Sequence, residues 1–206
     1  MNDRLPCAFF ERPVLEVARE LIGCTFLCDG VGGRLVEVEA YRAADDPASH
    51  AYRGRTERNA VMFGPAGRLY VYFTMGLHFC VNVVCGAEGE AAAVLLRALE
   101  PASGLELMRA RRGLDDARRL CSGPAKLTQA LAITRADYGA PVCERSARCG
   151  FYAPDAADGH GGGWSDGVAR IVATPRIGVA AGNDTRWRFV DADSAYLSRP
   201  LPRALR

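Results

Sequence analysis

The chain has 206 residues and a mass of 22.2 kDa, with 49% hydrophobic and 24% charged residues. These proportions are typical of one globular domain spanning residues 1–206, and they exclude a collagen, a membrane bundle and a disordered chain. The formal net charge is +2, and Lys126 is the only lysine among 26 basic residues. A general composition bias is the simpler explanation, but arginine also offers forked donors that match phosphate oxygens.

The amino terminus and the eight cysteines indicate in which cellular compartment the protein is expected. Residues 1–11 lack the basic and apolar regions of a signal peptide, and no run approaches the ~18 apolar residues of a membrane span. We therefore expect an intracellular protein without membrane contact, whose cysteines are buried small hydrophobic residues rather than a disulfide framework. The cysteine spacings and the three histidines fit no common zinc pattern, so no metal site is expected.

The first predicted elements are a helix and a strand. Residues 14–22 carry an apolar stripe at helical spacing between a proline and a glycine, which predicts an amphipathic helix. Residues 34–41 alternate between apolar and polar side chains, which predicts a strand. Glu37, Glu39 and Tyr41 share the face of this strand that we expect to be open.

A long polar loop and a hairpin come next. Residues 42–67 are rich in turn formers and include His50, and loops of this length are usually functional or mobile. Residues 68–74 and 78–84 are predicted to be two strands joined by a short turn at 75–77. The turn holds a methionine and a leucine, so the hairpin tip should expose apolar side chains.

The second half of the chain is predicted to contain both strands and helices. Residues 91–98 form a strand that includes Arg97, and Ser103 and Glu106 form a capping box that opens a helix ending at Arg112. The remaining predicted elements are a helix after residues 122–126, a flexible loop over 154–167, and strands over 168–174 and 187–190.

Glu39 is the first candidate catalytic residue. Two carboxylates on one strand face, Glu37 and Glu39, raise the free energy of double ionisation, which favours a general base. Tyr70 and Tyr72 share one face of a later strand, and aromatic side chains beside a carboxylate resemble a pocket for a nucleic-acid base. The alternatives are a solvated strand face for the acids and ordinary packing for the tyrosines.

The hairpin tip and Arg97 also allow two interpretations. Apolar side chains at a hairpin tip gain nothing locally from exposure to water, and a wedge that enters a base stack would explain them. The tip could equally pack beneath the 42–67 loop. Arg97 could be an ordinary surface residue of its strand.

A series of sequence blocks runs along residues 13–133 in a fixed order. The blocks are Val38-Glu-Ala-Tyr41, His50, Asn59-x-x-Met62-Phe63, Gly67-x-Leu-Tyr-Val-Tyr72, Phe79-Cys-x-Asn82, Val94-Leu-Leu-Arg-Ala-Leu-Glu-Pro101 and Leu120-Cys-Ser-Gly-Pro-x-Lys-Leu127, with a weaker match at Arg176-Ile-Gly178. In order and spacing they resemble the alkyladenine (3-methyladenine) DNA glycosylase family. One block alone is weak evidence, but the blocks in register are highly specific.

The resemblance implies a catalytic role for two residues. Glu39 corresponds to the family's general base, which deprotonates the water that attacks the anomeric carbon of a flipped nucleotide. Arg97 resembles the residue that helps to hold this water, with a main-chain carbonyl near Ile177 as a further partner. A carboxylate below the sugar suits this reaction, because cleavage of the glycosidic bond passes through an oxocarbenium-like state.

The resemblance also implies how a base is bound. Tyr41, His50 and Tyr72 look like the aromatic walls that enclose the extruded base. Asn82 matches the residue whose side chain collides with the exocyclic amine of normal guanine, which is specificity by exclusion. Met75 stands where the family carries the wedge that fills the duplex after flipping.

The expected fold is α+β, with a single mixed domain containing a curved antiparallel sheet, a protruding β-hairpin and surrounding helices. We expect a monomeric, monofunctional glycosylase that needs no cofactor or metal and removes alkylated purines from double-stranded DNA. Hypoxanthine, which is deaminated adenine, is a further candidate substrate. A glycosylase that also cuts the backbone usually needs an amine, and this chain offers only Lys126 and the terminal amine. The alternatives are a non-catalytic module that binds damaged DNA and an RNA-binding or formyl-transfer-like domain.

Met75 departs from the family pattern, which often has tyrosine at the wedge. Methionine is flexible and unbranched, so it fills the gap but stacks less rigidly than an aromatic ring. We predict that the wild type retains flipped bases more weakly than the Met75→Tyr variant. Stopped-flow fluorescence of base flipping measures this difference, and equal flipping equilibria for the two proteins would contradict it.

Overall fold

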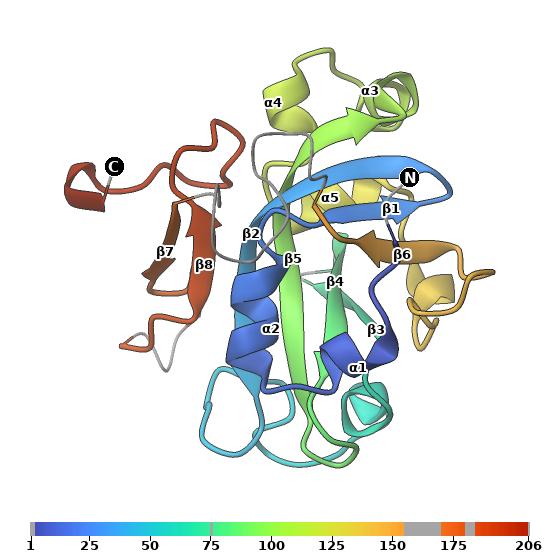
Figure 1. The fold of residues 1–206 in the computed structure, drawn as a ribbon, viewed down its shortest axis with the longest axis vertical. Coiled ribbons are helices and arrows are strands. Elements are labelled where there is room, and N and C mark those ends of the chain that lie inside the picture. The colour runs from blue at the N-terminus through green and yellow to red at the C-terminus, as the bar shows by residue number, and fades with distance from the viewer. Residues whose placement is uncertain (1–2, 75, 155–169, 180–183, 206) are drawn as a thin grey trace.

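The computed structural model describes residues 3–74, 76–154, 170–179 and 184–205 (Figure 1). One antiparallel sheet of eight strands forms the centre of the described residues, and short helices surround it. This architecture confirms the predicted α+β fold with a curved sheet, a hairpin and flanking helices.

The two long strands β2 and β5 organise the sheet. The path through the sheet is β3–β4–β5–β2–β1–β6. β2 pairs along its length with β5, while its other edge pairs first with β1 and then with β8, which also pairs with β7. The strands are β1 (Thr25–Cys28), β2 (Val31–Arg42), β3 (Leu69–Thr74), β4 (His78–Cys85), β5 (Ala92–Ser103), β6 (Cys149–Tyr152), β7 (Ile171–Thr174) and β8 (Arg188–Asp191).

The helices cover the sheet and its ends. They are α1 (Cys7–Phe10), α2 (Val14–Leu21), α3 (Leu105–Arg112), α4 (Ala117–Leu120) and α5 (Pro124–Ala130), with 3-10 turns η1 (Ala60–Phe63), η2 (Arg135–Asp137) and η3 (Arg203–Leu205). The predicted helices α2 and α3 are confirmed, and each begins and ends within two residues of its expected bounds. The helix expected after residues 122–126 is also present, and it begins within that segment, at Pro124. None of the helices in the described ranges is long and apolar enough to cross a bilayer.

The main core lies between the sheet and the helices α2 and α5. Val17 and Leu21 of α2 are fully buried there, together with Leu127 of α5. The same cluster includes two even-numbered strand residues, Val38 of β2 and Leu96 of β5. Because side chains alternate along a strand, the odd-numbered neighbours Glu37, Glu39 and Arg97 must lie on the opposite face of the sheet.

That opposite face is buried as well, which corrects one prediction. Glu37 and Glu39 are 0% exposed, so the open strand face expected from the alternation is wrong. β8 pairs beside both residues, and the segments carrying Ile177 and Ser198 hydrogen-bond to their carboxylates. The covering strand comes about 150 residues later in the chain, and a local pattern cannot indicate such a distant contact.

Glu37 lies between two buried arginines. Its Oε1 atom accepts hydrogen bonds from Nε of Arg97 and from Nε of Arg188, both at 2.8 Å. Ser198 donates to the same carboxylate from its hydroxyl and from its amide, each at 2.7 Å. Burial alone would raise the pKa of Glu37, but the hydrogen bonds and positive charge around it outweigh burial and lower that pKa.

The pairing of β2 with β5 is irregular at this point. The register shifts on both sides of Glu37, which pairs with Ala98, while Val38 pairs with Leu96. The ladder therefore skips Arg97. Irregularities of this kind often re-aim a side chain beside an active site, and here the guanidinium of Arg97 reaches the two carboxylates of β2.

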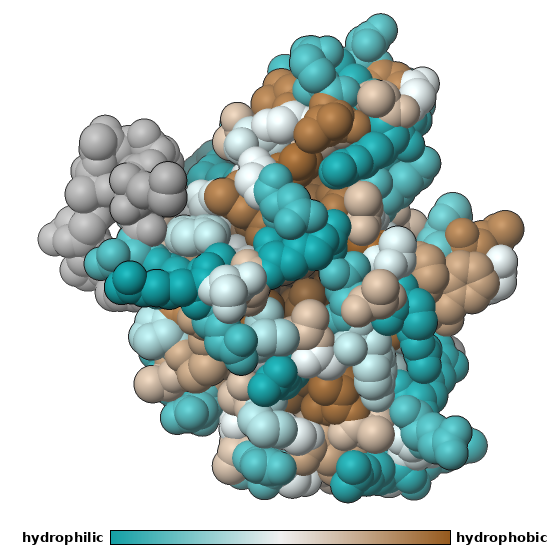
Figure 2. Space-filling view, turned by 90° about the vertical axis from the view of Figure 1, so that its right-hand side faces the viewer, coloured by the Kyte–Doolittle hydropathy of each residue, from teal (hydrophilic) through white to brown (hydrophobic). Residues whose placement is uncertain are grey.

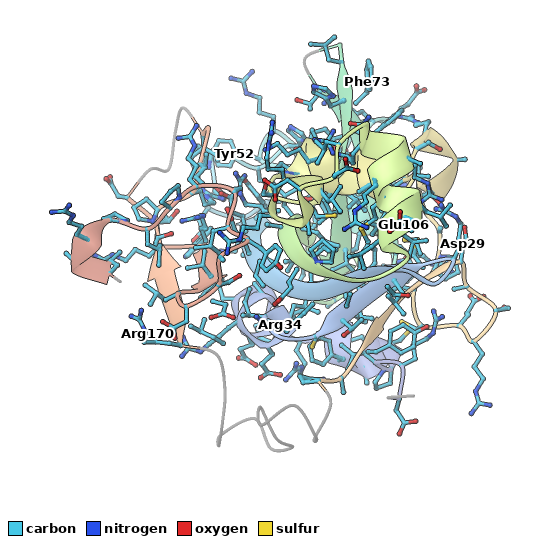
Figure 3. The ribbon with its side chains drawn as sticks, turned by 90° about the horizontal axis from the view of Figure 1, so that it is seen from above. Asp29, Arg34, Tyr52, Phe73, Glu106 and Arg170 are labelled. Carbon is cyan, nitrogen blue, oxygen red and sulfur yellow. A yellow bond between two sulfur atoms is a disulfide. The ribbon has the colours of Figure 1, made fainter. Side chains whose placement is uncertain are left out.

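The β3–β4 hairpin is confirmed, and its described tip residues are exposed. Leu77 is 72% exposed and Phe73 is 46% exposed, so packing of the tip beneath the 42–67 loop is wrong for Leu77. Figure 3 shows Phe73 at the outer end of the hairpin.

Elsewhere, Figure 2 shows hydrophilic and hydrophobic residues intermixed on one face of the molecule. Met75 lies outside the described residues, as does the predicted loop from residue 155 onward.

The start of α3 differs from the prediction. Gly104 in a left-handed conformation precedes the helix, with no side-chain cap. Ser103 belongs to β5 and donates its hydroxyl to the carbonyl oxygen of Gly30 at 2.6 Å. The predicted capping box is therefore wrong, because β5 runs five residues beyond Ala98 and takes up the serine. The strands β1 and β6 and the helix α4 have only four residues each and were not predicted.

The prediction for the cysteines is half right. Cys24, Cys80, Cys85 and Cys121 are buried free thiols, as expected. The other four form two disulfides, Cys7–Cys143 and Cys28–Cys149, so the expectation that no cysteines are paired is wrong. Cys28 and Cys149 face each other in the register of β1 and β6, and the sequence does not reveal that these strands are neighbours.

We predict that Glu37→Gln lowers the free energy of unfolding by about 3–5 kcal/mol, because it leaves two buried arginines without their shared counter-charge. The lowered pKa of Glu37 means that its contribution is complete at neutral pH and is lost as the pH falls from ~4.3 through the folded-state pKa. Denaturant unfolding at several pH values measures the difference.

Glu100→Gln is the matched control for this variant. Glu100 pairs with Arg34 on the same two strands, but the two side chains are 37% and 27% exposed. Removing a half-exposed pair of this kind costs at most about 1 kcal/mol. Equal stability of the Glu37→Gln variant and the wild type at pH 7 would contradict the prediction.

Candidate active site

The sequence-predicted site residues that the structure describes lie on strands, on one face of the sheet, except His50, which belongs to the loop after β2. β2 contributes Glu39 and Tyr41, and β5 contributes Arg97. From β3 and β4 come Tyr72 and Asn82, since Val71 and Val81 occupy the core side. The two-residue period of each strand therefore gathers residues from four strands onto the surface opposite the main core.

Glu39 is held by three hydrogen-bond donors. Its Oε2 atom accepts from the hydroxyl of Tyr41 at 2.7 Å and from Nη1 of Arg97 at 3.1 Å. Its Oε1 atom accepts from the main-chain amide of Ile177 at 2.7 Å. The group of Ile177 that contacts Glu39 is thus the amide, whereas the sequence suggested that a nearby carbonyl would hold the water.

The two oxygens of Glu39 differ in what they can still accept. A carboxylate oxygen has two lone pairs and accepts about two hydrogen bonds. Oε2 already has two donors, whereas Oε1 has one, and no second donor to Oε1 lies among the residues that the structure describes. Oε1 is therefore the oxygen with capacity to bind a further proton donor.

Tyr41 is supported from behind by a buried ion pair. The guanidinium carbon of Arg176 lies 4.5 Å from the centre of the Tyr41 ring. Arg176 forms two hydrogen bonds of 2.6 Å to Asp46, and both side chains are 0% exposed. Burial, followed by the charge and hydrogen bond of Glu39, raises the pKa of Tyr41, so its hydroxyl remains a proton donor.

His50 and Tyr72 form an aromatic group beside Tyr70. The ring centres of His50 and Tyr72 are 4.6 Å apart, and Nδ1 of His50 lies 2.9 Å from the hydroxyl of Tyr70. Partial burial of the imidazole and the charge of Arg58 lower the pKa of His50. The imidazole is therefore neutral at physiological pH. Burial raises the pKa of Tyr72, and Cys80, followed by Tyr70 and Glu39, adds to this shift.

Asn82 is fixed in orientation. Its side chain is buried, and Nδ2 donates to the main-chain oxygen of Tyr70 at 3.0 Å. Asn82 pairs with Tyr70 on one side and with Leu95 on the other. The asparagine therefore lies at the centre of the sheet face that carries Glu39 and the aromatic residues.

Several residues that shape this site were not identified from the sequence. They are Arg188 and Ser198 around Glu37, and Arg176 with Asp46 behind Tyr41. Of these four residues, only Arg176 lies in a segment that the sequence singled out, the weak family match at 176–178. No group of three or more metal-ligating side chains occurs among the described residues.

The chain matches a family of known proteins over most of its length. The model of the methylpurine-DNA glycosylase family matches residues 8–195. A Rhodopseudomonas palustris protein named "Putative 3-methyladenine DNA glycosylase" is 54% identical over 195 residues, which cover 95% of this chain and 88% of the relative.

Relatives from other bacteria carry the same name. One from Burkholderia lata is 48% identical over 201 residues, covering 97% of this chain and 93% of the relative. Another from Bradyrhizobium diazoefficiens is 47% identical over 196 residues, which cover 95% of this chain and 91% of the relative. The protein belongs to the methylpurine-DNA glycosylase family.

Proposed function

We propose that this DNA glycosylase extrudes alkylated purines from double-stranded DNA and hydrolyses their N-glycosidic bond with Glu39 as the general base. The observation that carries the proposal is the state of Glu39: a fully buried carboxylate that is fixed by three donors and whose Oε1 has a single donor among the described parts of the chain. A base for hydrolysis needs a fixed orientation and a free lone pair for the proton of water.

The reaction follows from this geometry. As the glycosidic bond breaks, its electron pair leaves with the purine, and positive charge develops on the sugar. Oε1 of Glu39 takes a proton from water, and the water oxygen forms the new bond to the anomeric carbon. The carboxylate also stabilises the positive charge of the transition state, because charges act strongly in a site that excludes bulk water.

The aromatic residues suit a cationic base. Alkylation at N3 or N7 makes a purine cationic, and a ring face favours such a cation by ~0.5–2 kcal/mol over a neutral base. The lowered pKa of His50 keeps its imidazole neutral. His50, which with Tyr41 and Tyr72 would enclose the base, therefore does not repel a cationic purine. This supports 3-methyladenine and 7-methylguanine as substrates, while hypoxanthine depends on the width of the pocket.

Asn82 supplies the exclusion step of the proposal. Its fixed side chain would collide with the exocyclic amine of normal guanine. The collision weakens the binding of the wrong base only. The bond of Nδ2 to Tyr70 supports this role, because a side chain that could swing away would not exclude anything.

Duplex DNA is the proposed partner. Exposed apolar residues at the hairpin, Phe73 and Leu77, flank the proposed wedge Met75 and could enter the base stack. The arginines of the 53–68 and 109–126 segments could neutralise phosphates. We further propose that the protein acts as a monomer on intracellular DNA.

The Glu39→Gln variant should lose excision by about 10²–10⁴-fold, the usual contribution of a general base, and should still bind lesion-containing DNA. Release of methylpurines from alkylated duplex DNA and binding to an abasic duplex measure the two properties. Glu88→Gln, a change of an exposed acid in the turn after β4, is the matched control with unchanged excision. Full excision by Glu39→Gln would remove Glu39 as the base, and a wild type that binds lesions but releases nothing would support a non-catalytic module instead.

The protein should leave an intact abasic site without cutting the strand. The only lysine, Lys126, lies at the start of α5 with its Nζ 3.4 Å from Oγ of Ser122, and it is not part of the site described above. Treatment of the wild type and lesion DNA with sodium borohydride should give no covalent adduct, because no Schiff base forms. A trapped adduct would show that an amine is the nucleophile.

A further inference from the structure

The loop after β8 brings one serine onto the buried charges of the sheet. Ser198 lies 161 residues after Glu37, yet its hydroxyl and its amide both donate to the Glu37 carboxylate at 2.7 Å. The same hydroxyl oxygen accepts a hydrogen bond from Nη2 of Arg97 at 3.4 Å. Ser198, Glu37 and Arg97 thus form a closed ring of hydrogen bonds.

We propose that Ser198 is a positioning residue that, together with Glu37, fixes Arg97 against Glu39. The inference rests on the proposed function, in which Glu39 is the base. Ser198 itself does not contact Glu39 in the structure. Its hydroxyl instead occupies a position between Glu37 and the end of the Arg97 side chain.

The ring constrains the direction of the Arg97 guanidinium. Nε binds Glu37 and Nη2 binds Ser198, so Nη1 is the nitrogen that reaches Glu39 at 3.1 Å. A guanidinium is planar, so fixing two of its nitrogens fixes the third. Without the serine hydroxyl, Arg97 would keep its bonds to Glu37 and Glu39 but lose its third anchor, so Nη1 would be held less rigidly against Oε2 of Glu39.

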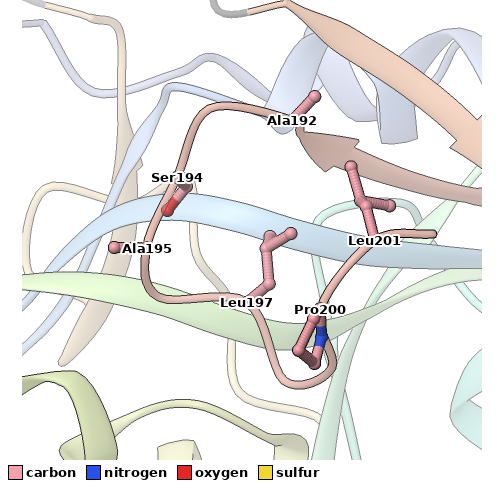
Figure 4. A pocket seen from close by; sticks show the side chains of 6 residues that line it. All are labelled: Ala192, Ser194, Ala195, Leu197, Pro200 and Leu201. Atoms are coloured by element: carbon pink, nitrogen blue, oxygen red, sulfur yellow. The ribbon is translucent and has the colours of Figure 1, made fainter. Parts of the chain in front are cut away.

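The loop depends on these polar contacts. Ser194, Leu197 and Pro200 line a cavity of about 270 Å³ (Figure 4), so the segment is not close-packed on that side. A further polar attachment is the bond from Nη2 of Arg188 to the carbonyl oxygen of Arg199 at 3.5 Å. The serine is therefore a main point at which the loop and the catalytic face are joined.

Ser198→Ala tests the proposal, because it removes the hydroxyl and keeps the amide bond to Glu37. Single-turnover excision of 7-methylguanine from a duplex oligonucleotide should slow by up to about 100-fold, the scale of a 1 Å misplacement of a catalytic group. Affinity for a duplex with a stable abasic analogue should stay unchanged. Ser198→Thr, which keeps the hydroxyl, should restore most of the rate.

Ser194→Ala is the matched control. Ser194 lies in the same loop and lines the cavity. Its hydroxyl accepts a hydrogen bond from the amide of Tyr196 and, among the residues that the structure describes, has no bond to Glu37 or Arg97, so excision should be unchanged. A Ser198→Ala rate equal to that of the wild type, or a Ser198→Thr rate as low as that of Ser198→Ala, would overturn the inference. If the wild type itself released no methylpurine, the proposed function would fail, which is a different result.

Discussion

The pairing of Glu37 with two buried arginines is the constraint on which the rest of the catalytic face depends. Arg97 comes from β5 and Arg188 from β8, so this one carboxylate joins three strands at the point where the ladder between β2 and β5 is irregular. Burying charges in this way is costly, and apolar residues of similar volume would often be as stable. The benefit of these charges is therefore that they fix the direction in which the guanidinium of Arg97 points.

That direction determines what Glu39 can do. Arg97 is shared between Glu37 and Glu39, and together with Tyr41 it occupies Oε2 of the proposed base. The remaining capacity lies on Oε1, next to the amide of Ile177. Two separate groups of buried ion pairs, one with Arg97 and Arg188 around Glu37 and one behind Tyr41, hold the two side-chain donors to Glu39. The chemistry proposed for this enzyme thus requires rigid support from residues that need not touch DNA.

The sequence could predict most of the local structure, because alternation and helical spacing are properties of short segments. It placed Glu39, Tyr41, Tyr72 and Arg97 correctly on strands, and a two-residue period puts them on one face. It could not predict that this face is buried, since the cover comes from β8 and the 192–201 loop, far along the chain. The disulfides and the partners of Glu37 escaped prediction for the same reason: they depend on which distant strands become neighbours.

The most direct test of the account is a crystal structure of the protein bound to duplex DNA that carries an uncleavable alkylpurine analogue. The account predicts the base between Tyr41, His50 and Tyr72, with one ordered water between Oε1 of Glu39 and the anomeric carbon. Arg97 should keep its bonds to Glu37 and Glu39. A base bound elsewhere, or a water held by a group other than Oε1, would contradict the central claim that the fixed carboxylate of Glu39 activates the nucleophile.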